Sequence, residues 1–334
     1  YSFCGQPFAG NNKSAIFYPF NFAVFRFIPF NYAFGFSAAL HVFLAGLFMF
    51  CFLRSLRAGR EAALFGAAAY MFAGWFVGIM QIYSRHDADI WLPLVLCLYE
   101  LSLRRKRFHL ALLAGVALGA QMLAGFIQTS AYHIMFLFAY ACWRSAAAWA
   151  AEKRPAAALR GMLFAGAVVA VGGALSAAQV LPVAAMLPHV PRVPTSFQHI
   201  LATGVSPGHF AGLFAPDLLG NPSKAKIFFQ AGAYVEINVY VGICAMILAV
   251  FGAVAARREQ RGAAIFFVAA SIVTVLMAMG TPLCGAFYYL VPGAKFTRPN
   301  RFLCLLPMCL SALAAFGAGA LMKDERGSSF PRGR

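Results

Sequence analysis

Long apolar runs separated by short basic clusters are the feature that most constrains how this chain can fold. Apolar stretches of roughly 20 residues, the length that a helix needs to cross a hydrocarbon layer of about 30 Å, recur along the whole sequence. Because 62% of the 334 residues are hydrophobic and only 11% are charged, a soluble domain could not bury so much apolar surface. The sequence therefore predicts an all-α fold, a polytopic transmembrane helical bundle surrounded by the lipid bilayer.

Taking each apolar run as one span predicts nine transmembrane helices in this chain. They are expected near residues 35–54, 61–82, 90–103, 108–127, 129–143, 161–182, 237–256, 262–280 and 302–322. The pairs Gly74/Gly78 and Gly115/Gly119 place small residues four apart, a spacing that permits close approach between membrane helices.

Basic clusters follow every second predicted span, which sets the orientation of the chain. The clusters RSLRAGR, RRKR, EKRP, RREQR and KDER would all lie on one side, and Lys and Arg prefer cytoplasmic loops. We therefore divide the chain into part of a first extracytoplasmic loop (1–34), spans (35–182), a large extracytoplasmic loop (183–236), spans that enclose an outer loop at 281–300 (237–322), and a cytoplasmic tail (323–334).

The stretch GFIQTSAYH leaves almost no turn between the two spans that meet near residue 128. It is compatible with a tight hairpin on the outer face or with one helix interrupted in mid-membrane. The hairpin is favoured, because a single span from 108 to 143 would reverse every later loop and place RREQR outside.

The net charge of +17 and the pI near 9.9 raise the question of nucleic-acid binding. The basic residues stand in short clusters at the ends of apolar runs, and no basic stripe with interleaved aromatic residues occurs in a polar domain. The pattern thus indicates no nucleic-acid partner. Walker, serine-hydrolase and dinucleotide-binding motifs are also missing from the sequence.

The charged stretch YSRHDADIWLP lies between two apolar runs, at the expected outer end of a span. It contains Arg85, His86, Asp87 and Asp89, and the two carboxylates have a D-x-D spacing. In a loop, both carboxylates could reach one divalent cation such as Mg²⁺ or Mn²⁺, or one hydroxyl-bearing sugar. The alternative is an interfacial ion network that anchors the helix end.

A second charged stretch, GAKFTRPNRF, comes just before the last predicted span on the same outer side. Its side chains Lys295, Arg298, Asn300 and Arg301 could bind a phosphate group, because guanidinium groups match phosphate oxygens well. The alternative is a general attraction of these cations to anionic lipid headgroups.

Other polar residues are weaker candidates. Gln128 and His133 flank the hairpin, where they would face substrate or water, or would join neighbouring helices by hydrogen bonds. In the large outer loop, side chains that could contact a sugar or act as an acid or base are Asp217, Glu236, His199 and His209.

Several stretches together resemble the YfhO family of bacterial membrane proteins. They are, in order, YSFCGQPFAGNNKSAIFYPFNF, HVFLAGLFMFCFLRSL, LAGFIQTSAY, GHFAGLFAPDLLGNP, VYVGICAMILAVFGAV and FTRPNRFLCLLPMCLSALAAFGAGAL. Each stretch alone is a loose pattern, but their order and spacing cover nearly the whole chain.

This resemblance implies a GT-C-type integral-membrane glycosyltransferase of the bacterial cytoplasmic (inner) membrane, with its active face outside. Such an enzyme would move a sugar from a polyprenyl-phosphate donor to a cell-envelope acceptor, an envelope glycan or a teichoic-acid-like polymer. The resemblance places the catalytic Asp upstream of Tyr1, so we expect this chain to be an N-terminally truncated fragment that lacks it. Asp87 and Asp89 would line the outer cavity, while Arg298 and Arg301 would hold the leaving phosphate.

Two other classes of function remain open at this point. A transporter or flippase for a lipid-linked or small polar solute would also need a polar cavity among helices, although no similarity between two halves is visible. A non-catalytic envelope assembly protein is the third alternative.

Overall fold

The structure is a computed structural model that describes residues 7–189, 194–221, 234–291 and 293–327, without the side chains of 323–327. The described part is all-helical and contains no strand, which confirms the predicted fold class. Its α-helices are α1 (Pro19–Phe27), α2 (Phe30–Ser55), α3 (Arg60–Met71), α4 (Gly74–Ile79), α5 (Tyr83–Asp89), α6 (Leu92–Arg105), α7 (Phe108–Leu123), α8 (Ile127–Glu152), α9 (Pro155–Met186), α10 (Phe197–Ala202), α11 (Ile243–Ala255), α12 (Arg261–Ala278), α13 (Cys284–Leu290) and α14 (Leu306–Gly327).

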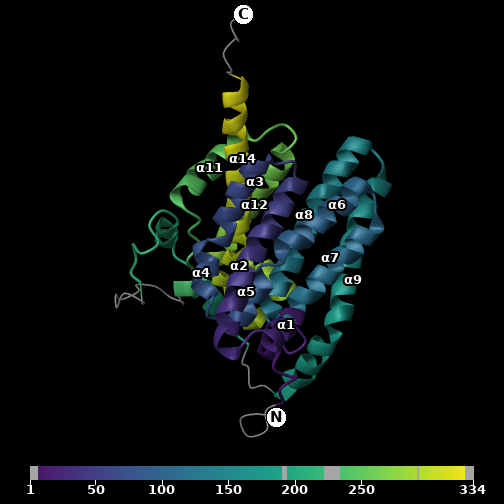
Figure 1. Ribbon diagram of the computed structural model, residues 1–334, viewed down its shortest axis with the longest axis vertical. Helices are drawn as coiled ribbons and strands as arrows, with labels where there is room; N and C mark the ends of the chain where they lie inside the picture. Colours follow the sequence, from purple (N-terminus) through teal and green to yellow (C-terminus); the bar gives the residue numbers. More distant parts are fainter. Residues whose placement is uncertain (1–6, 190–193, 222–233, 292, 328–334) are drawn as a thin grey trace, which may run out of the picture.

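The helices run side by side along the long axis of the molecule, and α6 to α9 form one group beside the others (Figure 1). Among the described residues, six segments are long and apolar enough to cross a membrane. They are Phe30–Ser55, Arg60–Ile79, Ile127–Glu152, Pro155–His189, Arg261–Ala278 and Pro299–Met322. The helices α7 and α11 are apolar but shorter, so the predicted count of nine spans is not confirmed.

The predicted span 61–82 differs most from the structure. It divides into α3 and α4, because the chain breaks at Phe72 and Ala73. The amide of Gly74 donates to the carbonyl of Tyr240 at 2.7 Å, and a Cβ at Gly74 would lie 2.2 Å from Oδ1 of Asn238. Residues 238–240 therefore pack directly against the start of α4, where a larger residue at position 74 would meet the side-chain amide of Asn238.

The basic clusters meet at one end of the bundle. Arg57 forms an ion pair with Glu259 at 3.0 Å, although both side chains are largely exposed. Arg104 donates to the carbonyl of Ser55 and Arg257 to the carbonyl of Gly319. These contacts join the α2–α3, α6–α7 and α11–α12 connections to α14, so clusters that are far apart in sequence share one end, which we call the basic end.

The other connections meet at the opposite end. The chain turns between α7 and α8 at Gly125, whose φ of +94° is in the left-handed region that favours glycine. A Cβ at Gly125 would lie 2.1 Å from the carbonyl oxygen of Asn12, so the N-terminal segment covers this turn. The amide of Thr195 donates to the carbonyl of Lys295, and that of Val205 to the carbonyl of Ala278. The favoured hairpin is thus present as a turn between two separate helices.

Candidate functional site

The stretch YSRHDAD forms the short helix α5, in which every residue from Ser84 to Asp89 is buried. The helix lies against α2, α4, α7 and α8. The prediction of a solvated outer loop is therefore wrong for this stretch. Its apolar flanks and the small residue Ala88 let it fold inward, where its charged side chains find partners on other elements.

The centre of the site is a buried carboxylate, Glu236, that binds three side chains. It lies in a short 3₁₀ helix, η5 (Tyr234–Glu236), and its side chain is 8% exposed. Its Oε1 accepts from Arg85 Nη1 at 2.8 Å and from Arg301 Nε at 2.9 Å, and its Oε2 accepts from Asn300 Nδ2 at 3.1 Å. Arg301 also donates to Oε1 of Gln128 on α8. We call these five residues the Glu236 network.

The network joins four parts of the chain. Arg85 comes from α5, Gln128 from α8, and both Asn300 and Arg301 from the 3₁₀ helix η7 (Pro299–Leu305) that leads into α14. Gln128 additionally donates to the hydroxyl of Tyr132 at 2.7 Å. For both residues these contacts match the alternative to substrate binding. Arg85 takes part in an ion network, and Gln128 forms hydrogen bonds between helices. The acidic partner of Arg85 is Glu236 from the large loop.

The guanidinium of Arg85 is enclosed by aromatic rings. Its Cζ lies 4.5 Å from the centre of the Trp75 ring and 5.4 Å from that of Phe126. The indole of Trp75 in turn donates to Oδ2 of Asp89 at 2.6 Å. Burial raises the pKa of the Asp89 carboxyl, although the charge of Arg85 and the hydrogen bond from Trp75 oppose this. Asp89 thus supports the ring on which Arg85 lies.

Protonation of Glu236 gives the first testable prediction. Burial raises the pKa of Glu236, but Arg301 and Arg85 lower it by more, so the pKa lies below the usual value of 4.5. A carboxyl with a lowered pKa stabilises the fold above its unfolded pKa, and this contribution disappears as pH falls through the folded pKa. We expect the free energy of unfolding to fall below about pH 4.5.

Unfolding titrations in detergent between neutral pH and about pH 3 test this, with Glu236→Gln as the comparison. Glutamine does not titrate, so the variant should be less stable at neutral pH and should lack this part of the acid slope. The pKa of Asp89 is raised, so its effect on the pH dependence of stability has the opposite sign. Both proteins therefore carry Asp89→Asn, which removes this contribution from the comparison. If the free energy of unfolding of the Glu236→Gln variant fell with acid as steeply as that of the unchanged protein, Glu236 would not be the group that titrates.

A second buried network surrounds Asp87 on the same helix. Its Oδ1 lies 3.5 Å from Nδ1 of His41 and 3.4 Å from Nδ1 of His86. The hydroxyl of Tyr18 is 2.9 Å from Nε2 of His41 and accepts from the indole of Trp91 at 3.2 Å. These five residues, the Asp87 network, connect α1 and α2 to α5 and the start of α6.

Asp87 and Asp89 do not converge on one point. They stand two apart in a helix, where side chains face roughly opposite directions, and each carboxylate has its own partners. Among the described residues, no group of three or more His, Cys, Asp or Glu side chains is arranged to hold a metal ion. The shared Mg²⁺ or Mn²⁺ site therefore lacks a geometric basis in α5. Both aspartates are only 2% exposed, so neither lines an open cavity.

The remaining predicted cations lie at the rim of the Glu236 network. Lys295 and Arg298 are exposed, and Nζ of Lys295 lies 5.7 Å from the centre of the Tyr288 ring. Arg298 directly precedes η7, and its side chain makes no hydrogen bond or ion pair with any described residue. Of the predicted phosphate ligands, Asn300 and Arg301 are thus engaged by Glu236, whereas Lys295 and Arg298 face outward.

The other predicted residues lie apart from these networks. His133 is buried in α8, and its Nδ1 has no hydrogen-bond partner. Asp217 accepts from Asn221 at 2.8 Å and from Tyr234 at 3.1 Å, so it ties its segment to η5. His199 is exposed in α10, and His209 contacts Ser206. The structure does not bring these residues together.

Sequence reasoning missed Tyr18, His41 and Trp75. The sequence did contain a signal for His41. An ionisable side chain inside an apolar span costs free energy in the membrane, and this cost alone marks it as a candidate site residue. Tyr18 and Trp75 gave no such signal. Aromatic residues are common in this sequence, and only the fold shows which of them carry a buried hydrogen bond.

The apolar helices, the shared basic end and the buried polar networks at the opposite end define a polytopic helical membrane protein. More specifically, residues 14–330 match the family model described as bacterial membrane protein YfhO. The chain belongs to this family, as its sequence resemblance predicted. Searches of curated proteins and of solved structures gave no match.

Proposed function

We propose that this chain is part of a membrane glycosyltransferase of the GT-C type. It would transfer a sugar from a polyprenyl-phosphate donor to an envelope glycan or teichoic-acid-like acceptor on the extracytoplasmic face. The observation that carries the proposal is the position of Arg298. This exposed cation, whose side chain has no partner among the described residues, lies beside the buried Glu236 network, at the end of the bundle opposite the basic end.

The Glu236 network supports this role by fixing the backbone that presents Arg298. Arg301 and Asn300 are bound to Glu236, and Arg301 is also bound to Gln128, so η7 is held from two sides. A guanidinium held at a fixed position stabilises charge that develops on a leaving phosphate without reorganisation during the reaction. Lys295, three residues earlier in the chain, adds a second exposed cation.

The orientation of the bundle agrees with this assignment. The basic end carries the clusters that prefer the cytoplasm, so the proposal assigns Arg298 and Lys295, at the opposite end, to the extracytoplasmic side. A polyprenyl-phosphate headgroup lies at the membrane surface, at the level where a helix such as α14 begins. Asp87 and Asp89 are buried, so their role in this proposal is to hold α5 and Arg85 in place and not to contact the sugar.

The test is sugar transfer by the protein expressed from its natural reading frame. Proteoliposomes receive radiolabelled hexoses linked to a polyprenyl phosphate, together with envelope glycan or teichoic acid as acceptor. We expect Arg298→Ala to lower kcat/KM at least tenfold, or about 1.4 kcal/mol in transition-state stabilisation.

Arg26→Ala is the matched control, because Arg26 is an exposed arginine in α1 at the same end of the bundle. It should retain transfer within about twofold, since it removes only general surface charge. Equal losses in the two variants would reject a specific phosphate contact. Uptake of a labelled solute without any transfer would instead identify a transporter.

A further inference from the structure

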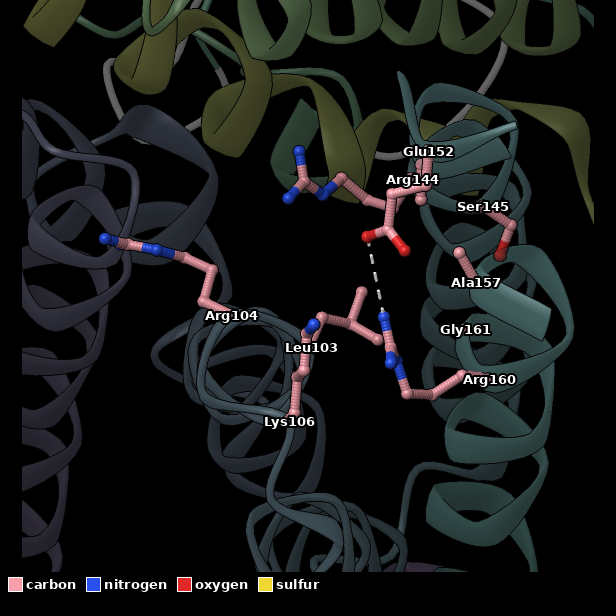
Figure 2. A pocket seen from close by; sticks show the side chains of 10 residues that line it. Leu103, Arg104, Lys106, Arg144, Ser145, Glu152, Ala157, Arg160 and Gly161 are labelled. Atoms are coloured by element: carbon pink, nitrogen blue, oxygen red, sulfur yellow. Dashed lines mark ion pairs between the residues drawn. The ribbon is translucent and has the colours of Figure 1, made fainter. Parts of the chain in front are cut away.

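A pocket at the basic end lies at the opposite end of α8 from the Glu236 network and takes no part in the proposed transfer. It is formed by the ends of α6, α8 and α9, and its cavity has a volume of about 230 Å³. Apolar parts of the wall come from Leu103 and Ala157 (Figure 2), and also from Ala148. A water molecule occupies about 30 Å³ in the liquid, so a volume of this size holds a phosphate group together with several water molecules.

The polar lining of the pocket is strongly cationic. Arg104, Lys106, Arg144 and Arg160 line it, and Glu152 is the acidic residue in its wall. Arg104 is turned toward the carbonyl of Ser55 and away from Arg160 (Figure 2). The charge in the lining is therefore unbalanced in favour of an anion.

Donors in the lining remain without partners. Arg144 Nη2 binds Glu100 at 2.9 Å, and the other oxygen of Glu100 accepts from Tyr140 at 2.9 Å, so this carboxylate is already satisfied. The Nε atoms of Arg144 and Arg160 and the Oγ of Ser145 are buried and have no hydrogen-bond partner in the described part of the chain. Buried polar atoms are nearly always paired in proteins, so three unpaired ones around one pocket point to a missing ligand or to water.

The acidic residue in the lining is only weakly engaged. Arg160 Nη2 lies 3.9 Å from Oε1 of Glu152, with side chains 30% and 43% exposed. Figure 2 shows this ion pair among the side chains that line the pocket. An exposed pair at this separation contributes about 0–1 kcal/mol, so an anion with better geometry can replace the carboxylate as the partner of Arg160.

We propose that this pocket binds a phosphate group, with Arg160, Arg144 and Lys106 as its cationic ligands and Ser145 as a hydroxyl donor. Guanidinium groups bind phosphate oxygens through two parallel hydrogen bonds, and the ammonium of Lys106 adds charge. Two sources share this chemistry, the headgroup of an anionic lipid and a soluble phosphate ester. Basic pockets between membrane helices on the cytoplasmic side are suited to the first.

The test is ligand binding by the purified full chain in detergent, measured by native mass spectrometry. The probes are phosphatidylglycerol, zwitterionic phosphatidylcholine and soluble glycerol phosphate. We expect the Lys106→Gln/Arg160→Gln variant to weaken binding of the preferred anionic probe at least tenfold, or about 1.4 kcal/mol. The control variant Arg105→Gln/Arg107→Gln removes two exposed charges from the same connection, outside the pocket lining, and should change binding less than twofold.

A steric variant keeps the test decisive if the charge variant folds poorly. Ala148→Trp leaves every charge in place and fills the cavity from its half-exposed wall, so it should also weaken binding at least tenfold. Pocket-dependent binding of phosphatidylglycerol identifies a lipid site, and pocket-dependent binding of glycerol phosphate identifies a soluble ligand. Equal losses in the pocket and control variants, or no pocket-dependent binding of either phosphatidylglycerol or glycerol phosphate, would overturn the proposal.

Discussion

The Glu236→Ala variant is expected to lose about 3–5 kcal/mol of folding free energy, because the change leaves the buried guanidinium of Arg85 and the half-buried one of Arg301 without their carboxylate. The side chain of Arg85 is 2% exposed, so water cannot replace the lost partner. Arg301 is 26% exposed and keeps its bond to Gln128, so it is the less affected of the two. Unfolding by detergent titration, followed by circular dichroism, measures the loss.

A second glutamate in this chain supplies the control. Glu259 also pairs with an arginine, Arg57, at 3.0 Å, but their side chains are 62% and 57% exposed. Exposed pairs contribute about 0–1 kcal/mol, so Glu259→Ala should hardly change stability. If Glu236→Ala and Glu259→Ala lowered the free energy of unfolding by the same small amount, the buried contacts of Glu236 would not stabilise the fold. Glu236 would then not hold η7 in place.

The sequence predicted most of the chemistry of this network but not its pairing. Arg85, Arg301 and Asn300 were expected to bind a substrate, and Glu236 was one of four candidates in the large loop. Their mutual contact joins residues separated by 64 to 151 positions. The spacing of residues in one sequence does not show which residues that are far apart in the chain contact each other in the fold. The cations at the rim, Arg298 and Lys295, were predicted to bind phosphate from residue type and position, and that role stays a prediction.

Helices were easier to predict than their breaks. Each predicted span corresponds to a helix or to two consecutive helices, because apolar length is a local property. The break between α3 and α4 and the inward course of α5 depend on contacts with residues 236–240, which are distant in sequence. Charged residues in YSRHDAD favoured a solvated loop as long as their partners were unknown.

The close packing of helices was also only partly predictable from the sequence, because it depends on contacts between distant parts of the chain. Gly115 and Gly119 were predicted to permit close approach, and a Cβ at Gly115 would lie 2.6 Å from Cβ of Val171 on α9. The tightest approach, however, is between α11 and α14. A Cβ at Gly317 would lie 2.1 Å from the carbonyl oxygen of Leu248, and a Cβ at Gly252 would lie 2.0 Å from that of Leu313. These two glycines are on different helices, so no spacing within either run indicated them.

Gly317→Ala is therefore expected to destabilise the protein by about 3 kcal/mol, at the upper end of the usual cost of overpacking. The added methyl group meets backbone atoms of α11, which cannot move aside as a flexible side chain can. In addition, α14 is buried over most of its length, so the helix cannot shift without disturbing its contacts with α3 and α12. The same detergent titration measures the change.

Gly319→Ala, two residues further along α14, is the matched control. A Cβ there would lie 3.5 Å from Cβ of Ala62, which is an ordinary van der Waals contact. Alanine favours the helix over glycine by about 1 kcal/mol, so this variant should be neutral or slightly more stable. Opposite signs for the two substitutions would show that backbone contact between α11 and α14 determines the stability of this half of the bundle. Equal effects would mean that helix propensity alone decides, and that the two helices are further apart than the structure places them.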